Sequence, residues 1–387
     1  MARLIPPSRS CLTTTPTRSA LFNLGSSLKQ WTESIKGKEE LSDSERPLPR
    51  FYSMVCKDKE REYYDYESAE VLFGFQDDYE FSAKLGRGRY SEVFKGVNLL
   101  TNEQCVVKIL KPVKRSKIKR ELQILETLNG HPYIVTLLDY VCDPSTKTPA
   151  IVMEYVRNVD YKTLYPILSK EDIKLYIFQI LQGLDYAHSK GIIHRDIKPG
   201  NVLFDHNSKQ IKIVDWGLAD FYHPHKNYNV RVASRYFKAP ELLVGNGYYD
   251  YQLDIWSVGC MMAGMMFVRE PFFKGADNQD QLIKIAKFIG TDDIVEYCNK
   301  YRIKLDAYYD DKLINFKKKQ WEKMVNSQNE ELVEDKAFDL LTRMLCIDHI
   351  ERISAAEALL HPYFDTVRST MLDRGQFESS RGAYKTV

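Results

Sequence analysis

The sequence predicts an α+β protein in which a small β-rich lobe precedes a larger, mainly helical lobe. Between residues 79 and 110, short apolar runs alternate with turn residues, which is typical of strands. From Ser116 onward, apolar residues recur at helical spacing, and this pattern dominates the chain beyond residue 160. The chain has 387 residues, 44% of them hydrophobic and 28% charged, which suits a folded protein and excludes a mostly disordered one.

Charge and cysteine content exclude several classes of protein. Lys and Arg number 55 against 53 Asp and Glu, so the net charge is only +2 and nucleic acid is not a default partner. The seven cysteines include no pair two to four residues apart, so we expect free thiols rather than a zinc or redox motif. The longest apolar stretch, Ile255–Val268, is shorter than the roughly 20 residues that span a bilayer, so we expect a buried helix and no membrane contact.

Residues 1–50 are expected to form a disordered basic extension. The first 32 contain four basic residues, ten Ser or Thr and no acid, so they cannot bury enough apolar surface to offset the entropy lost on folding. The same composition is found in organelle transit peptides, which is the alternative interpretation.

The two lobes are expected to meet near Tyr155–Asn158, giving domains at 79–157 and 158–365 and a C-terminal tail over 366–387. Gly130 and Pro132 should end the first long helix. In chain order, strands are expected at 79–82, 92–94, 105–110, 135–140 and 150–155, and helices at 116–128, 172–189 and 253–267.

A glycine-containing turn separates the first two strands. In Leu85-Gly86-Arg87-Gly88-Arg89-Tyr90-Ser91 the glycines would let backbone N–H groups approach phosphate oxygens closely. The motif alone is weak, because such a turn is more often an ordinary hairpin and Ser91 replaces the third glycine of G-x-G-x-x-G. A strand follows the turn instead of a helix, which argues against a dinucleotide-binding fold.

Lys108 lies in the apolar strand Cys105–Leu110, where an unpaired amine would be costly. Glu121 follows thirteen residues later, within the next helix. A lysine that binds nucleotide phosphates and is held by a helix glutamate accounts for both residues. An exposed lysine on an edge strand is the simpler alternative.

Three further motifs occur in a fixed order. The sequence His194-Arg195-Asp196-Ile197-Lys198-Pro199-Gly200-Asn201 is followed by Asp215-Trp216-Gly217 and then by Ala239-Pro240-Glu241. With these motifs the chain resembles the eukaryotic protein kinases from about residue 79 to residue 364. The resemblance implies a bilobal protein kinase fold and transfer of a nucleotide γ-phosphate.

The resemblance also implies a role for each residue of these motifs. Asp196 would accept the proton of the substrate hydroxyl, Lys198 would reach the transferring phosphate, and Lys108, held by Glu121, would bind the α- and β-phosphates. Asn201 and Asp215 would supply oxygen ligands for the Mg²⁺ that accompanies ATP or GTP. Glu241 is expected to pair with Arg352 in a structural role. The other expected nucleotide contacts are Leu85, Gly86, Arg87, Gly88, Arg89, Tyr90, Ser91, Val93, Val106, Met153, Glu154, Val156, Leu203 and Val214.

A closer resemblance is to the catalytic alpha subunits of casein kinase II. It is carried by Arg61–Glu67, by Gly86–Phe94, by Val107–Arg120, by Asp215-Trp216-Gly217 with tryptophan in place of the usual phenylalanine, and by Tyr228–Tyr236. It implies a serine/threonine kinase that prefers acidic sequence contexts and uses GTP as well as ATP. Met153 departs from the family, whose members usually carry phenylalanine at this gatekeeper position.

Two basic clusters are expected to recognise an acidic peptide, and polyanions such as heparin should then compete with that peptide. The first is the segment 111–120, for which a solvated helix face and a nuclear-import signal are the alternatives. The second lies just before Ala239. The expected substrate contacts are Lys114, Arg115, Lys117, Lys119, Arg120, Arg231, Arg235 and Lys238.

The activation segment, residues 215–241, contains no Thr, and its only Ser is Ser234, which we expect to position Asp196 and Lys198. Arg195 therefore lacks the phosphothreonine that usually neutralises it. The resemblance implies that an N-terminal arm, residues 51–78, packs on the activation segment instead, so we expect activity without phosphorylation there. A solvated linker is the alternative for the arm.

The outer face of the small lobe is expected to bind a partner. Strand alternation places Val107 on the face opposite the cleft, although this apolar face could also be core under a loop. The resemblance implies the dimeric regulatory beta subunit of casein kinase II as the partner, giving an alpha2-beta2 tetramer. The expected contacts are Tyr79, Phe81, Phe94, Val107, Val141 and Val152.

Two other functions have less support. A pseudokinase scaffold would lack Lys108, Asp196 or Asp215, and all three are present. A specific nucleic-acid-binding protein would interleave aromatic residues among the basic residues of 111–120. We expect the protein in the nucleus and cytoplasm, with an organelle as the alternative if residues 1–50 are a targeting signal.

Overall fold

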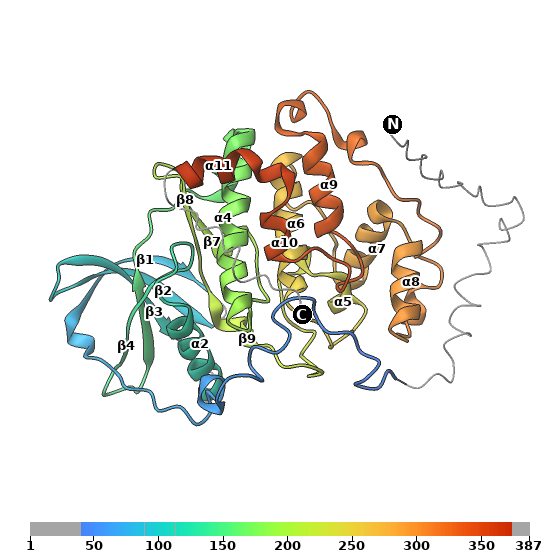
Figure 1. The fold of residues 1–387 in the computed structure, drawn as a ribbon. Helices are drawn as coiled ribbons and strands as arrows, with labels where there is room; N and C mark the ends of the chain where they lie inside the picture. The colour runs from blue at the N-terminus through green and yellow to red at the C-terminus, as the bar shows by residue number, and fades with distance from the viewer. Residues whose placement is uncertain (1–39, 89, 113, 374–387) are drawn as a thin grey trace, which may run out of the picture.

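The computed structural model describes residues 40–88, 90–112 and 114–373, which fold into two lobes (Figure 1). Residues 1–39 of the expected extension and residues 374–387 of the expected tail lie outside this part of the chain, as does Arg89. The small lobe contains β1 (Tyr79–Arg87), β2 (Ser91–Asn98), β3 (Glu103–Leu110), α2 (Arg115–Leu128), β4 (Leu137–Cys142) and β5 (Pro149–Glu154).

The large lobe is mainly helical, as expected, and carries two short antiparallel strand pairs, β6 with β9 and β7 with β8. Its helices are α3 (Tyr161–Leu164), α4 (Lys170–Ser189), α5 (Pro240–Leu243), α6 (Gln252–Met266), α7 (Asn278–Ile289), α8 (Asp292–Lys300), α9 (Asp335–Met344), α10 (Ala355–Leu359) and α11 (Asp365–Asp373). Its strands are β6 (Ile192–Ile193), β7 (Val202–Asp205), β8 (Gln210–Ile213) and β9 (Asp220–Phe221).

The five strands of the small lobe form one antiparallel sheet in the order β1-β2-β3-β5-β4. β3 therefore has a neighbour on each side, and Lys108 pairs with Val93 on β2 and with Ile151 on β5. The alternative that Lys108 lies on an edge strand is wrong, because β3 is an interior strand. Its side chain is held inside the lobe and must find a partner there.

Helix α2 follows the sheet and buries the face predicted by its periodicity. Leu122, Leu125 and Leu128 are at most 3% exposed, and Glu121 is buried beside them. A buried glutamate on an otherwise apolar helix face needs a cation nearby. The helix therefore brings a carboxylate to the inner face of the sheet, where Lys108 lies.

Helices α4 and α6 form the centre of the large lobe. α4 begins with a capping box in which the Ser169 hydroxyl accepts from Asp172 N and the Asp172 carboxylate accepts in return from the Ser169 backbone. Every residue of α6 is buried, which confirms the expected buried helix as far as Met266. Val268, the last residue of the expected stretch, lies beyond the helix and is 40% exposed. Within the described residues, no helix is both long enough and apolar enough to span a membrane, and the cysteines there are free thiols.

The expected pair of Glu241 and Arg352 is present inside the large lobe. The Arg352 Nη1 and Nη2 atoms donate to the two Glu241 carboxylate oxygens at 2.8 and 2.9 Å, and both side chains are 0% exposed. Other guanidinium hydrogens bond the backbone oxygens of Cys346, Gln252 and Ile347. Burial opposes the charged form of Arg352, but Glu241 outweighs it and raises the Arg352 pKa.

The outer face of the sheet is less open than the sequence suggested. Val107, Val141 and Val152 pack in a small apolar cluster and are at most 5% exposed, so these three expected partner contacts are core residues instead. Phe81 is 52% exposed and stacks on Phe94 at 5.6 Å between ring centroids. Any partner would reach this face through the two phenylalanines, since the valines already have apolar neighbours.

Candidate active site

Lys108, Glu121 and Asp215 meet between the lobes. Lys108 Nζ lies 2.6 Å from Glu121 Oε1 and 2.8 Å from Asp215 Oδ1. Burial would lower the pKa of Lys108, but the two carboxylates outweigh it and raise the pKa above its ordinary value. The ammonium is thus fixed in its charged form, as a phosphate-binding lysine must be.

Asp215 faces an open space while remaining paired. Its side chain is 50% exposed, and its backbone has a left-handed φ of 60°, which aspartate tolerates better than most residues. The charge of Lys108 lowers the pKa of Asp215, so this carboxyl stays ionised. The next residue, Trp216, is fully buried and lies edge-on to the His194 ring at 4.6 Å, which anchors the turn that presents Asp215.

Asp196 is held by a ring of hydrogen bonds. Lys198 Nζ donates to Asp196 Oδ2 at 2.6 Å, and Asn201 Nδ2 donates to the same oxygen at 3.1 Å. Ser234 Oγ donates to Asp196 Oδ1 at 2.9 Å and accepts from Lys198 Nζ at 2.9 Å. The structure therefore brings Ser234 to the two residues that we expected it to position.

Asn201 and Asp215 fit a magnesium site of the kind that phosphates complete. Both Asn201 Nδ2 hydrogens point at Asp196, toward its carboxylate and its backbone oxygen, which turns the amide oxygen of Asn201 away from Asp196. In the described part of the chain, no three His, Cys, Asp or Glu side chains gather as a metal site. Mg²⁺ commonly uses one or two protein oxygens together with water and substrate phosphates, so a two-ligand site agrees with the chemistry.

A cavity of about 260 Å³ lies over these groups. It is lined by Lys108, Glu121, Asp196, Lys198 and Asp215. Three residues of the glycine turn, Gly88, Tyr90 and Ser91, close it on the sheet side. This end of the site brings together the residues expected to bind phosphate and to react.

The expected adenine contacts lie on neighbouring elements and outside this cavity. Val106 pairs with Met153 across β3 and β5, and Val93 is on β2, while Leu203 lies on β7. Glu154 does not offer its side chain to a nucleotide, because Lys212 Nζ lies 2.7 Å from its carboxylate. The remaining expected contacts occupy β1 (Leu85, Gly86, Arg87), the link to the large lobe (Val156) and the segment after β8 (Val214).

The basic residues expected to bind substrate separate into different places. Lys117 lines the active-site cavity, whereas Arg115 and Lys119 line a groove of about 920 Å³ elsewhere on the small lobe. Helical periodicity explains this split, because residues two apart point in different directions. Lys119 Nζ also donates to the backbone oxygen of Glu67, so it holds the arm.

Two of the expected substrate contacts, Arg120 and Lys238, are engaged by other parts of the protein. Arg120 donates to Gly217 O at 3.3 Å and lies 3.5 Å from Asp220, so it fastens α2 to the activation segment. Lys238 is only 8% exposed and donates to Val232 O, and burial lowers its pKa. Lys114, Arg231 and Arg235 are exposed, so their charges remain available to a ligand.

Asp220 is a residue that the sequence reasoning missed. Its carboxylate lies 3.0 Å from Arg195 Nη2, 3.5 Å from Arg120 Nη1 and 3.9 Å from Lys226 Nζ. Burial disfavours the charged form of Arg195, but Asp220 outweighs it and raises the Arg195 pKa. The sequence did contain a signal for this role of Asp220, because it is an acid only five residues after Asp215. Arg195 needed an anion, and the activation segment contains no Thr that could be phosphorylated to supply one.

The N-terminal arm packs on the activation segment, and the alternative of a solvated linker is wrong. The Tyr63 ring lies edge-on to Phe221 at 5.7 Å, and the Tyr64 ring lies edge-on to His223 at 4.8 Å. Gln123 of α2 donates to the backbone oxygens of Glu62 and Tyr63 at 2.7 Å. The arm is therefore tied to both the helix and the segment that must be ordered.

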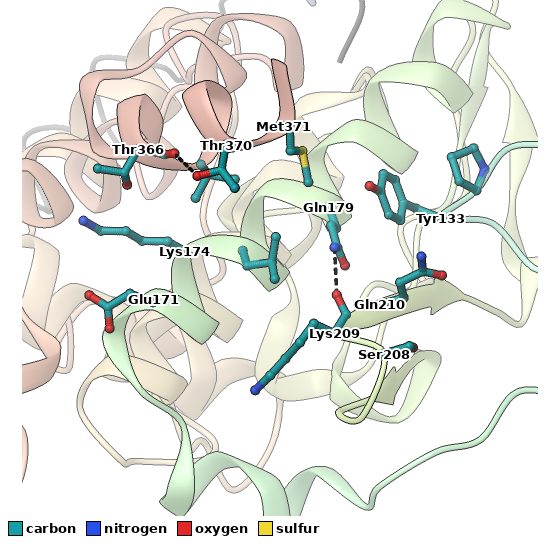
Figure 2. Close-up of a pocket in the computed structure, with 13 residues that line it drawn as sticks. Tyr133, Glu171, Lys174, Gln179, Ser208, Lys209, Gln210, Thr366, Thr370 and Met371 are labelled. Carbon is teal, nitrogen blue, oxygen red and sulfur yellow. Dashed lines mark hydrogen bonds between the residues drawn. The ribbon is translucent and has the colours of Figure 1, made fainter. Parts of the chain in front are cut away.

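A second cavity, of about 610 Å³, lies on the large lobe (Figure 2). Side chains of α4 and α11 face it from one side, and Lys209 and Gln210 face it from another (Figure 2). Its lining contains none of the expected site residues. The candidate active site is thus the cavity between the lobes.

The chain matches a protein-family model. The model for the protein kinase domain matches residues 79–364, which is more than half of the chain. The match begins where β1 begins and ends at Phe364, just before α11. It therefore contains both lobes and every motif of the candidate active site.

Proposed function

The chain belongs to the protein kinase family, and from that premise we propose that it phosphorylates Ser or Thr in acidic contexts, as casein kinase II does. The observation that carries the transfer chemistry is the convergence of Lys108, Asp196 and Asp215 on one cavity, with Asn201 hydrogen-bonded to Asp196 behind it. Phosphoryl transfer depends on in-line positioning and charge neutralisation, and the side chains that line this cavity offer both.

Each residue has a distinct task in this proposal. The Lys108 ammonium binds the α- and β-phosphates, and Lys198 stabilises charge on the transferring phosphate. Asp196 orients the substrate hydroxyl and accepts its proton, while the Ser234 hydrogen bond keeps its carboxylate aimed. Asn201 and Asp215 would hold Mg²⁺, which when bound neutralises phosphate charge.

The proposed kinase works without phosphorylation of its activation segment. In many kinases a phosphate on this segment balances the arginine that precedes the catalytic aspartate. Here the Asp220 carboxylate lies 3.0 Å from Arg195, and the same carboxylate also approaches Arg120 of α2. An aspartate supplies this charge permanently, so the segment needs no modification to become ordered.

A preference for acidic peptides is supported by the basic residues on α2 and on the activation segment. Lys117 lines the cavity, and Lys114 is exposed nearby at the start of α2. Arg231 and Arg235 are exposed on the activation segment close to Ser234. Cations on both sides of the acceptor position attract carboxylates and repel basic peptides.

Further properties carry over from casein kinase II as proposals. We infer use of GTP as well as ATP, with Met153 in the gatekeeper position altering inhibitor selectivity. We also infer binding of a regulatory beta-subunit dimer, supported by the exposed ring of Phe81 stacked on Phe94. Heparin is expected to inhibit by competing for the basic residues, and the nucleus and cytoplasm are the expected compartments.

A peptide assay tests the proposed specificity. The full chain is given Mg²⁺ and labelled ATP or GTP with matched peptides whose single acceptor is Ser, Thr or Tyr in an acidic, neutral or basic context. We expect transfer to Ser and Thr in the acidic context, inhibition by heparin, and no phosphate on residues 215–241 by mass spectrometry. Transfer that favours the basic peptide, or that requires prior phosphorylation of Ser234, would contradict the proposal.

A further inference from the structure

We propose that a basic cavity on the large lobe, different from the one in Figure 2, binds an acidic stretch of a protein substrate. This stretch lies beyond the residues of the substrate that occupy the active site. This cavity, of about 290 Å³, lies among the loop after α6, helix α7 and the segment that precedes Trp321. The inference deepens the proposed preference for acidic substrates and rests on it. It adds a docking site that the kinase motifs do not include.

The cavity concentrates positive charge from three separate stretches of chain. Its lining carries five cations and no acid: Arg269, Lys274, Lys284, Lys287 and Lys319. In the described part of the chain, Lys284 alone among them has a carboxylate within 4.0 Å, that of Asp280 at 3.8 Å. Cations that line one cavity repel one another, so an anion that enters the cavity reduces this repulsion.

The floor of the cavity is apolar and well packed. Phe272, Phe273 and Phe288 line it and are at most 8% exposed. Phe288 packs edge-on against Phe272 at 5.3 Å and against Phe273 at 6.2 Å. A floor without polar groups lowers the local dielectric constant, which strengthens the attraction between the cations and a bound carboxylate.

The loop on one side of the cavity is fastened to the segment that follows Ser234. Arg235 donates to the backbone oxygens of Gly275 and Ala276, immediately after Lys274. The buried Gln281 of α7 donates to both Tyr236 O and Phe273 O at 3.2 Å. The segment that follows Ser234 and the loop that lines the cavity are therefore held together by hydrogen bonds.

This connection favours a polypeptide as the occupant. An extended chain advances about 3.3 Å per residue, so a substrate leaving the active site over Arg235 can reach Lys274 and the cavity behind it. Its acidic side chains can then contact cations from several stretches together. A small free anion would occupy the same charges but would gain nothing from the link to the active site.

Two peptides and two double variants test the proposal. Both peptides share one acidic acceptor sequence, and the longer continues through a Gly/Ser spacer into an acidic block. The test variant, Lys287→Glu/Lys319→Glu, reverses two exposed charges of the cavity. The control variant, Lys147→Glu/Lys336→Glu, reverses two exposed charges that lie outside its lining.

We expect the test variant to raise the KM of the longer peptide about tenfold while leaving the KM of the shorter one unchanged. The control variant should change neither KM, and the Tm of both variants should match the parent. Equal changes for the two peptides, or no change for either, would overturn the docking site.

A binding measurement separates this proposal from the proposed activity. The longer peptide, with Ala at the acceptor position and a fluorescent label, is titrated with the full chain and followed by anisotropy. Binding that the test variant weakens supports the cavity even if no phosphate is transferred. Binding of inorganic polyphosphate but not of this peptide would show a small-anion site and overturn the proposal.

Discussion

Two buried ion pairs have similar N···O distances but differ in their exposure to solvent. In the cleft, Lys108 lies 2.6 Å from Glu121, and in the large lobe Arg352 lies 2.8 Å from Glu241. The second pair is sealed, with both side chains 0% exposed. The first opens onto the active-site cavity through Asp215, whose side chain is half exposed.

Their charges differ as clearly as their exposure. Arg352 and Glu241 form a neutral pair, and backbone oxygens take further guanidinium hydrogens. Lys108 faces two carboxylates, so its cluster keeps one negative charge beside the cavity. A bound metal cation can compensate that charge, whereas the sealed pair has none left to offer a ligand. We conclude that the open cluster serves chemistry and that the sealed pair serves stability.

The largest expected effect comes from the cleft side of this comparison. Asp196→Ala should lower kcat by about a thousandfold, because the hydroxyl of the substrate loses both its orienting group and its proton acceptor. ATP binding, measured by calorimetry, should stay close to that of the parent. Residual turnover within tenfold of the parent would remove Asp196 from the proposed role.

A smaller effect is expected at the charge that orders the activation segment. Asp220→Asn keeps the shape of the side chain but leaves Arg195 and Arg120 without their shared anion, so we expect kcat to fall about tenfold. The exposed Asp311→Asn change is the matched control. Steady-state kinetics of both variants give the two kcat values. An unchanged kcat in Asp220→Asn would show that another interaction orders the activation segment.

The arm should contribute less than Asp220. Deletion of residues 51–68 is a crude test, because Cys56 is buried in the main core and its loss would expose that core. Tyr63→Ala/Tyr64→Ala removes the two ring contacts to the segment, and each such contact contributes about 1 kcal/mol. We expect kcat to fall severalfold with little change in KM, and a normal kcat would limit the arm to a structural role.

The smallest expected effect separates two faces of α2. Lys117→Glu should raise the KM of an acidic peptide about fivefold and change the KM of ATP less, since Lys117 lines the active-site cavity. Arg115→Glu, two residues earlier, is the matched control because Arg115 lines a different groove. Equal peptide KM values for the two variants would contradict this assignment.

Much of the active site follows from sequence because its motifs are local. Asp196, Lys198 and Asn201 lie within six residues, so their meeting in space depends on one loop. The strands and long helices could likewise be predicted from their periodicity, to within a few residues of the observed ends. The pairings of Lys108 with Glu121 and of Glu241 with Arg352 needed the family resemblance as well.

The errors concern residues whose surroundings come from distant parts of the chain. Arg120 and Lys238 look like free charges in the sequence, but in the fold both donate to backbone oxygens, and Arg120 also lies near Asp220. Val107 and Val152 alternate correctly along their strands, yet alternation cannot show that the outer face has its own core. The role of Asp220 depends on cations from three elements, which no local pattern records.

The central claim is that the open cluster serves catalysis and the sealed pair serves stability. The most direct test measures kcat and Tm side by side for Lys108→Met and Arg352→Met. We predict that Lys108→Met loses at least about a hundredfold in kcat, because a charge that binds phosphate is gone, and loses less stability than Arg352→Met, because its cluster opens onto the cavity through the half-exposed Asp215. Arg352→Met should lose about 3–5 kcal/mol of stability but keep a near-normal kcat at temperatures where it is folded. The opposite pattern, with activity lost in Arg352→Met and stability lost in Lys108→Met, would contradict the account.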